Sequence, residues 1–192
     1  MAPILLISTH RCEALDGESD TYFLELRPSL PTVGPMELVP AIALLLHPVL
    51  ATGLVVWVWW QYTWRRTSKE LKGEERVAYR TRHEVNGERL LIATGAVILI
   101  AFAGRMVNGW YTQGSVWADI WPQSLHGYMG PLGFALLLAL SRFGREAKTL
   151  REQGESYALA KTKHGRAADL VIYLVFIHAF MGFIYTFDIF LA

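Results

Sequence analysis

Six histidines are the residues of this 192-residue chain whose type and placement point to chemistry. All but His10 lie within or at the end of a long apolar run. Lipid offers no hydrogen-bond partner to an imidazole ring, so such a histidine needs one from the protein or from a bound group. The pattern predicts either a cofactor held between helices or rings that are hydrogen-bonded inside a bundle. The residues are His47, His83, His126, His164 and His178.

Composition narrows the class of protein. Hydrophobic residues make up 53% of the chain, charged residues 18%, and the formal net charge is +1. For the chain as a whole, these values exclude a protein that is only a disordered tail, a basic nucleic-acid-binding domain and an ordinary soluble enzyme. The charges are clustered in blocks between long apolar runs, which is typical of a polytopic membrane protein. The single cysteine, Cys12, excludes a disulfide framework, a Cys-x-x-Cys pair and a site for covalently attached haem.

Four apolar runs are long enough to cross the membrane, since a helical span needs roughly 20 residues for about 30 Å of hydrocarbon. Backbone polar groups in lipid must be satisfied within their own segment, which requires helices. We therefore expect an all-α protein, an integral membrane four-helix bundle. The third run is the weakest because it opens with polar residues. The runs are Leu38–Trp64, Leu90–Trp110, Trp121–Ser141 and Leu170–Ala192.

The distribution of cations predicts the topology. Eight of the 18 Lys and Arg residues lie between Arg65 and Arg89, and seven lie between Arg142 and Arg166. By the positive-inside rule both loops face the cytoplasm, or the stroma of a plastid. Both termini are then expected on the opposite, non-cytoplasmic side.

Residues 1–35 differ in character from the rest of the chain. They are rich in proline and acidic residues and contain no apolar core that would fit a signal peptide. We expect a poorly ordered N-terminal tail here and a transmembrane domain over residues 36–192. Met36 directly precedes the first span, so translation starting at Met36 is an alternative to Met1.

Helical rise places four of the histidines at two depths. Counted from the nearest cytoplasmic cation, His47 lies about 27 Å deep and His126 about 24 Å, which we call the far layer. His83 and His164 lie at the cytoplasmic margin and form the near layer, on the order of 20 Å away. Two imidazoles at one depth on different helices are what a six-coordinate b-type haem requires. The spacing predicts two such haems.

His178 is a further candidate for the far layer. It follows His164 by 14 residues, which is four turns, and so lies on nearly the same face about 21 Å deeper. His178 would then replace His47 or His126. We expect His178 to be the histidine that does not bind. Small residues such as Gly87, Gly127 and Gly165 lie near the histidines, which fits either a flat macrocycle or close helix packing without a cofactor.

Charged residues at depth also need partners. Arg105 lies about 22 Å into its helix. A haem propionate is one expected partner, and an ion pair with Asp188 or Asp119 is the alternative. Four cations surround the near layer and would hold propionates or attract an anionic reductant. They are Arg80, Arg82, Lys163 and Arg166.

Four short motifs surround the histidines, namely His47-Pro48, Arg80-Thr81-Arg82-His83 with Gly87, His126-Gly127 and Lys163-His164. Over roughly residues 36–192 they resemble an uncharacterised family of four-helix membrane proteins of cyanobacteria and plastids. That family is similar to the ascorbate-reducible di-haem transmembrane cytochromes b, whose core helices pair first with third and second with fourth. The resemblance implies that the axial ligands are His47, His83, His126 and His164.

These observations predict a transmembrane b-type cytochrome, an electron-transfer oxidoreductase whose donor and acceptor the sequence does not name. The resemblance implies a cyanobacterial thylakoid or plasma membrane. Another hypothesis is an accessory or assembly subunit of a larger photosynthetic or respiratory membrane complex. Some histidines would then bind chlorophyll, which needs one axial ligand. The remaining alternative is a membrane scaffold without a cofactor.

Overall fold

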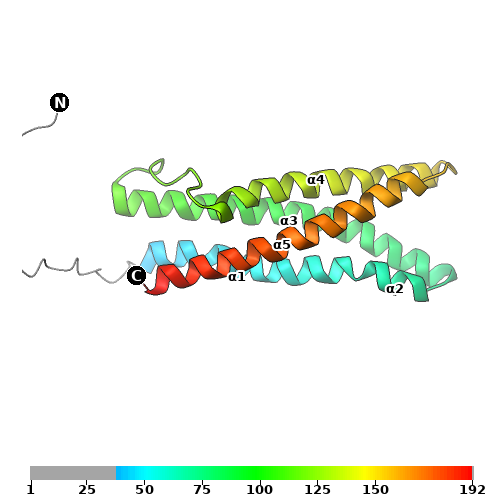
Figure 1. The fold of residues 1–192 in the computed structure, drawn as a ribbon, viewed down its shortest axis with the longest axis horizontal. Helices are drawn as coiled ribbons and strands as arrows, with labels where there is room; N and C mark the ends of the chain where they lie inside the picture. Colours follow the sequence, from blue (N-terminus) through cyan, green and yellow to red (C-terminus); the bar gives the residue numbers. More distant parts are fainter. Residues whose placement is uncertain (1–37, 192) are drawn as a thin grey trace, which may run out of the picture. The chain divides into compact units, whose positions relative to one another are not determined.

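The computed structural model describes residues 38–191, and the side chains of residues 38–187. This range is helical and contains no strand, which confirms the all-α prediction. The expected tail over residues 1–35 and the alternative start at Met36 lie outside the described residues. Figure 1 shows long helices that run alongside one another, with α2 continuing α1 and the chain reversing before α3, α4 and α5. The helices are α1 (Leu38–Tyr62), α2 (Trp64–Glu70), α3 (Gly73–Gln113), α4 (Leu125–Glu152) and α5 (Ala158–Leu191).

Three helical segments are long and apolar enough to cross a membrane. They are Leu38–Glu70, which combines α1 and α2, then Gly73–Gln113, and Ala158–Phe187 within α5. Within residues 38–191, α4 does not meet this criterion, although a span was expected over residues 121–141. The helix begins only at Leu125, and its second half carries the charges that start at Arg142.

The long helices associate as two antiparallel pairs. α1 packs mainly on α3, and α4 packs mainly on α5, while contacts of α1 with α5 and of α3 with α4 are less extensive. Val58, Leu90 and Ile172 form a small buried cluster between the pairs. Among the described side chains no large one is completely buried. The helices therefore meet closely within each pair and less closely between the pairs.

The start of α4 is fixed by local interactions. The Ser124 side chain accepts a hydrogen bond from the backbone N–H of Gly127 at 3.2 Å, so it caps the helix. A Cβ atom on Gly127 would lie 2.7 Å from Cβ of Pro122, so the entering chain needs glycine there. The cap places His126 in the first turn of α4.

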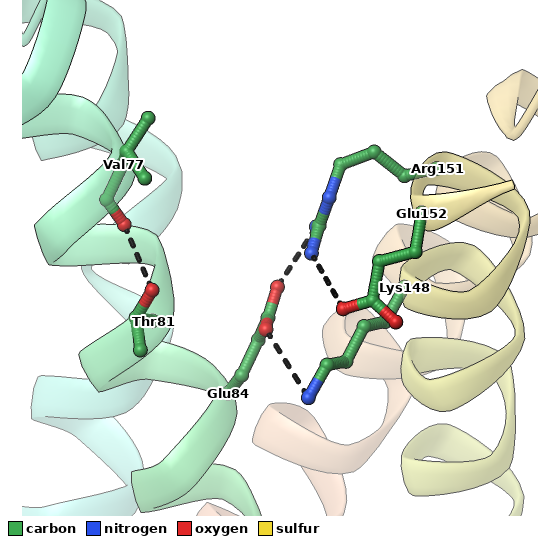
Figure 2. Close-up of polar contacts among 6 residues, drawn as sticks. All are labelled: Val77, Thr81, Glu84, Lys148, Arg151 and Glu152. Atoms are coloured by element: carbon green, nitrogen blue, oxygen red, sulfur yellow. Dashed lines mark hydrogen bonds and ion pairs between the residues drawn. The ribbon is translucent and has the colours of Figure 1, made fainter. Parts of the chain in front are cut away.

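Ion pairs join the two helix pairs at the ends that the sequence predicts to be cytoplasmic. Figure 2 shows Glu84 of α3 reaching toward Arg151 and Lys148 of α4. Arg151 donates to the Glu84 carboxylate at 2.8 Å, and Lys148 lies 3.8 Å from it. On the other side Asp169 of α5 accepts a hydrogen bond from the Tyr62 hydroxyl at 2.7 Å.

Removing the charge of Glu84 tests whether these contacts hold the pairs together. We expect Glu84→Gln to lower the free energy of unfolding by about 0.5–1 kcal/mol, because Arg151 loses its closest anionic partner and keeps only Glu152 of its own helix at 3.8 Å. Thermal unfolding in detergent should show a fall of about 2 °C in Tm. Glu88→Gln is the matched control, since Glu88 is exposed on the same helix and forms no ion pair in the described residues. Equal shifts in both variants would contradict the assignment.

Candidate functional site

Three histidines from three helices meet in the far layer. His47 of α1 and His126 of α4 have ring centroids 6.2 Å apart at an interplanar angle of 72°. His178 of α5 stacks on His126 with centroids 4.0 Å apart and an angle of 12°. One ring nitrogen from each of the three lies within 4.8 Å of the others. The structure thus brings together all three histidines that the sequence proposed for this depth.

Two further histidines meet in the near layer. His83 of α3 and His164 of α5 have ring centroids 6.2 Å apart at an angle of 86°. The indole of Trp64 stacks on the His83 ring with centroids 5.1 Å apart. In both layers the two facing histidines come from different helix pairs, so each layer bridges the interface where the pairs meet.

Hydrogen bonds orient three of these rings. The Nδ1–H of His47 donates to the carbonyl of Val97 at 3.3 Å, that of His126 to the carbonyl of His178 at 3.0 Å, and that of His164 to the carbonyl of Leu140 at 3.1 Å. Each bond ties the two helices of one pair together. A neutral ring that donates through Nδ1 keeps a lone pair on Nε2, which is the arrangement found in histidines that bind metals.

His83 departs from this pattern. Its Nδ1 is buried and has no hydrogen-bond partner among the described residues. Its backbone carbonyl instead accepts a hydrogen bond from the Gln61 side chain of α1 at 2.7 Å. The Nδ1 atom of His178 is likewise buried without a partner in the part of the chain that the structure describes.

One spacing relates the two layers on all four long helices. A residue that takes part in the far layer lies 14 residues from a residue that takes part in the near layer, which is four turns or about 21 Å. The residue pairs are His47 and Gln61 in α1, Val97 and His83 in α3, His126 and Leu140 in α4, and His178 and His164 in α5. The helices therefore run nearly in register over both layers.

Two glycines make room for rings on the partner helix. A Cβ atom on Gly182 of α5 would lie 2.6 Å from Cε1 of His126, and one on Gly144 of α4 would lie 3.2 Å from the ring of His164. Each glycine follows by four residues the carbonyl that its histidine bonds, His178 in one case and Leu140 in the other. Both antiparallel contacts therefore use the same local motif.

The separation of the rings fits a metal held between them. With metal–nitrogen bonds of about 2.0 Å on opposite sides of an ion, two coordinating imidazoles have their centroids about 6.3 Å apart. Both facing pairs are at 6.2 Å. The donor set of two neutral imidazoles suits iron in a porphyrin, which supplies the four remaining ligands.

His178 is poorly placed to share a metal with His126. The lone pair of an imidazole nitrogen lies in the plane of its ring, and the two ring planes are nearly parallel. In-plane lone pairs of stacked rings do not converge on one ion. The geometry favours His47 and His126 as the facing pair, with His178 supporting His126 through its backbone carbonyl and its ring.

Arg105 is bonded to backbone carbonyls and not to the carboxylate of Asp119. Its Nε donates to the carbonyl of Asp119 at 2.5 Å and its Nη2 to the carbonyl of Trp121 at 3.1 Å. The Asp119 carboxylate is bonded instead by Asn108. The expected ion pair with Asp119 is therefore wrong, because the loop after α3 folds back and presents carbonyls to the guanidinium. The side chain of Asp188 lies outside the described residues.

Arg82 lies on the exposed side of the near layer. Its guanidinium is 5.9 Å from the centre of the Tyr79 ring. Lys163 similarly lies 6.0 Å from the ring of Phe143.

Comparisons of the chain with protein-family models, curated proteins and solved structures found no match.

Four residues that build the layers were not expected from the sequence. Gln61 and Trp64 contact His83, while Gly144 and Gly182 receive histidine rings. The number of residues between each of them and a histidine would have indicated most of them. Gln61 follows His47 by the shared 14 residues, and both glycines follow a histidine of the opposite layer by 18 residues.

Filling the space over Gly182 tests the contact with His126. We expect Gly182→Ala to lower the free energy of unfolding by about 1–3 kcal/mol, because the added methyl group overlaps the ring. Gly133→Ala is the matched control, since a Cβ atom there meets nothing within 4 Å and alanine favours the helix. Thermal unfolding should show a lower Tm for Gly182→Ala and an unchanged or higher Tm for Gly133→Ala. A Gly182→Ala variant as stable as the control would show that the ring lies elsewhere.

Proposed function

We propose that the protein is a transmembrane b-type cytochrome that holds one haem b in each layer. His47 and His126 would be the axial ligands in the far layer, and His83 and His164 those in the near layer. The observation that carries the proposal is the distance of 6.2 Å between ring centroids in both pairs, which is close to the value of about 6.3 Å for two imidazoles bound to one metal. A haem bound in this way would supply one-electron chemistry between ferric and ferrous iron.

The protein's own residues would fix the rings and the surroundings. The carbonyls of Val97, His178 and Leu140 hold the Nδ1–H groups, so the Nε2 atoms stay free to coordinate. Gly182 and Gly144 let two rings lie close to a helix backbone.

The membrane arrangement is part of the same proposal. α4 would cross the membrane as a fourth span beside the three more apolar segments, because it packs along α5, which is one of them. The cation-rich segments would face the cytoplasm and both termini the other side. Electrons would then pass between a donor at one surface and an acceptor at the other. A cyanobacterial thylakoid or plasma membrane is the expected location, on the resemblance of the motifs alone.

The paired arrangement favours haem over chlorophyll. Chlorophyll uses one axial histidine, and a second facing ring at 6.2 Å would have no role in binding it. Arg82 and Arg105 would contribute positive charge toward the acidic groups of a haem at the near and far layers.

The visible spectrum of the purified protein tests the cofactor directly. We expect a b-type haem spectrum whose α band sharpens on reduction with dithionite, because both axial positions are filled by imidazole. Pyridine haemochrome analysis should give two haems per chain. A red chlorophyll band would instead support the role of an accessory subunit, and the lack of any pigment after expression with sufficient haem would contradict both.

Single substitutions test the choice of ligands. We expect His47→Ala and His83→Ala each to remove about half of the haem, because each variant empties one layer. His178→Ala is the control from the same cluster, since alanine keeps the carbonyl that His126 bonds. It should retain nearly all of the haem. Haem content per chain is the measurement, and a loss in His178→Ala equal to that in His47→Ala would contradict the assignment.

A further inference from the structure

Of the four proposed ligands, His83 alone has a ring that no hydrogen bond orients within the described residues. His47, His126 and His164 each donate from Nδ1 to a carbonyl of the neighbouring helix, whereas Nδ1 of His83 is buried without a partner there. The bond that Gln61 donates reaches the backbone carbonyl of His83, so it holds the helix and not the imidazole. The χ2 torsion of histidine has broad minima, so another contact must set the plane of this ring.

The indole of Trp64 supplies such a contact. Its plane is 21° from that of the His83 ring, with the centroids 5.1 Å apart. The same indole stacks on Tyr79, with centroids 5.0 Å apart and an angle of 14°. Tyr79 and His83 are four residues apart in α3, so their side chains lie on one face of that helix. Because Trp64 is the first residue of α2, one rigid ring from α2 holds two rings of α3 nearly parallel to itself.

A ring that lies against the face of an imidazole fixes its plane and leaves its donor atoms usable. The lone pair of an imidazole nitrogen lies in the plane of the ring, so covering the face does not block it. Offset stacking favours nearly parallel planes with centroids 4.5–7 Å apart, and the contact of Trp64 with His83 meets both conditions. The His83 plane held in this way crosses that of His164 at 86°.

The far layer contains the same kind of contact. The His178 ring lies 4.0 Å from His126 at an angle of 12°, while His126 crosses the facing ring of His47 at 72°. In each layer, one of two crossed rings is therefore backed by a third ring that is nearly parallel to it. His126 has its hydrogen bond in addition, whereas His83 relies on the stack.

We propose that Trp64 is a positioning residue for His83, because the stacked indole holds the imidazole in the plane in which it faces His164. This inference rests on the function proposed above, in which these two histidines are the axial ligands of the near layer. Trp64 acts through His83 and not on the bound group. A site whose binding orientation is only partly populated loses affinity in proportion to that population.

The first test uses the haem-free full chain with ¹³C-labelled histidine in lipid nanodiscs. The ring current of a stacked indole shifts the NMR signals of the imidazole, and the His83 signal is identified by its loss in His83→Gln. We expect this signal to move toward its position in free histidine in Trp64→Leu, and to return most of the way in Trp64→Phe, which keeps a flat ring. Nuclear Overhauser contacts between the Trp64 and His83 rings should be present in the unchanged protein, so the test does not depend on a variant that folds.

Trp60→Leu is the matched control. Trp60 precedes Trp64 by four residues, is 51% exposed and stacks on no histidine among the described residues. The His83 signal should keep its position in this variant. A signal that stays in place in Trp64→Leu, or that moves equally in Trp60→Leu, would overturn the contact, as would the lack of Overhauser contacts in the unchanged protein.

The second test uses the haem-loaded protein. We expect Trp64→Leu to weaken haem binding in the near layer about two- to tenfold, which is the range given by the strength of an aromatic pair, and Trp64→Phe to restore most of it. The paramagnetic resonance spectrum of a low-spin ferric haem depends on the angle between its two axial rings. The signal that is lost in His83→Ala should therefore shift or broaden in Trp64→Leu, while the signal that is lost in His47→Ala should not.

The outcomes separate this inference from the cytochrome assignment. Haem-loaded protein whose near-layer signal and affinity are unchanged in Trp64→Leu would overturn the positioning role and leave the cytochrome intact. Equal losses of affinity in Trp64→Leu and Trp64→Phe would also overturn it, because Phe keeps a ring that can stack. A protein that takes up no haem would overturn the cytochrome assignment and with it the role toward a ligand, even where the NMR measurement supports the stack.

Discussion

An imidazole ring inside an apolar bundle has two nitrogens to satisfy, and this requirement organises the structure. Three of the five histidines in the helices donate from Nδ1 to a backbone carbonyl of the neighbouring helix. Those bonds join α1 to α3 and α4 to α5, which are also the two closely packed pairs. Because Nδ1 of each of these three rings is bonded within a helix pair, Nε2 remains available to bind another group.

Register along the helices turns these separate contacts into two layers. A repeat of 14 residues is close to four helical turns, so both residues of each repeat lie on one face. Since all four long helices follow the repeat, their contacts fall at the same two heights about 21 Å apart. The glycines at 144 and 182 extend the correspondence, because each lies four residues beyond a carbonyl that accepts from a histidine.

The two layers differ in what surrounds them. The near layer has ion pairs on both sides, with Glu84 and Arg151 on one and Arg65 and Asp169 on the other. It also has the stacked rings of Trp64 and Tyr79. The far layer has a third histidine and a loop pinned by Arg105.

The sequence by itself determined the helical class, three of the apolar segments and the grouping of the histidines at two heights along the helices. These properties depend on hydropathy and on a fixed rise per residue, which are local. It did not determine the partners of Arg105, the stacking of His178 on His126 or the use of Gly144 and Gly182. Such contacts depend on how far each helix is rotated about its axis and on the path of the loop after α3. Both are set by packing between segments far apart in the chain, so only the tertiary structure decided them.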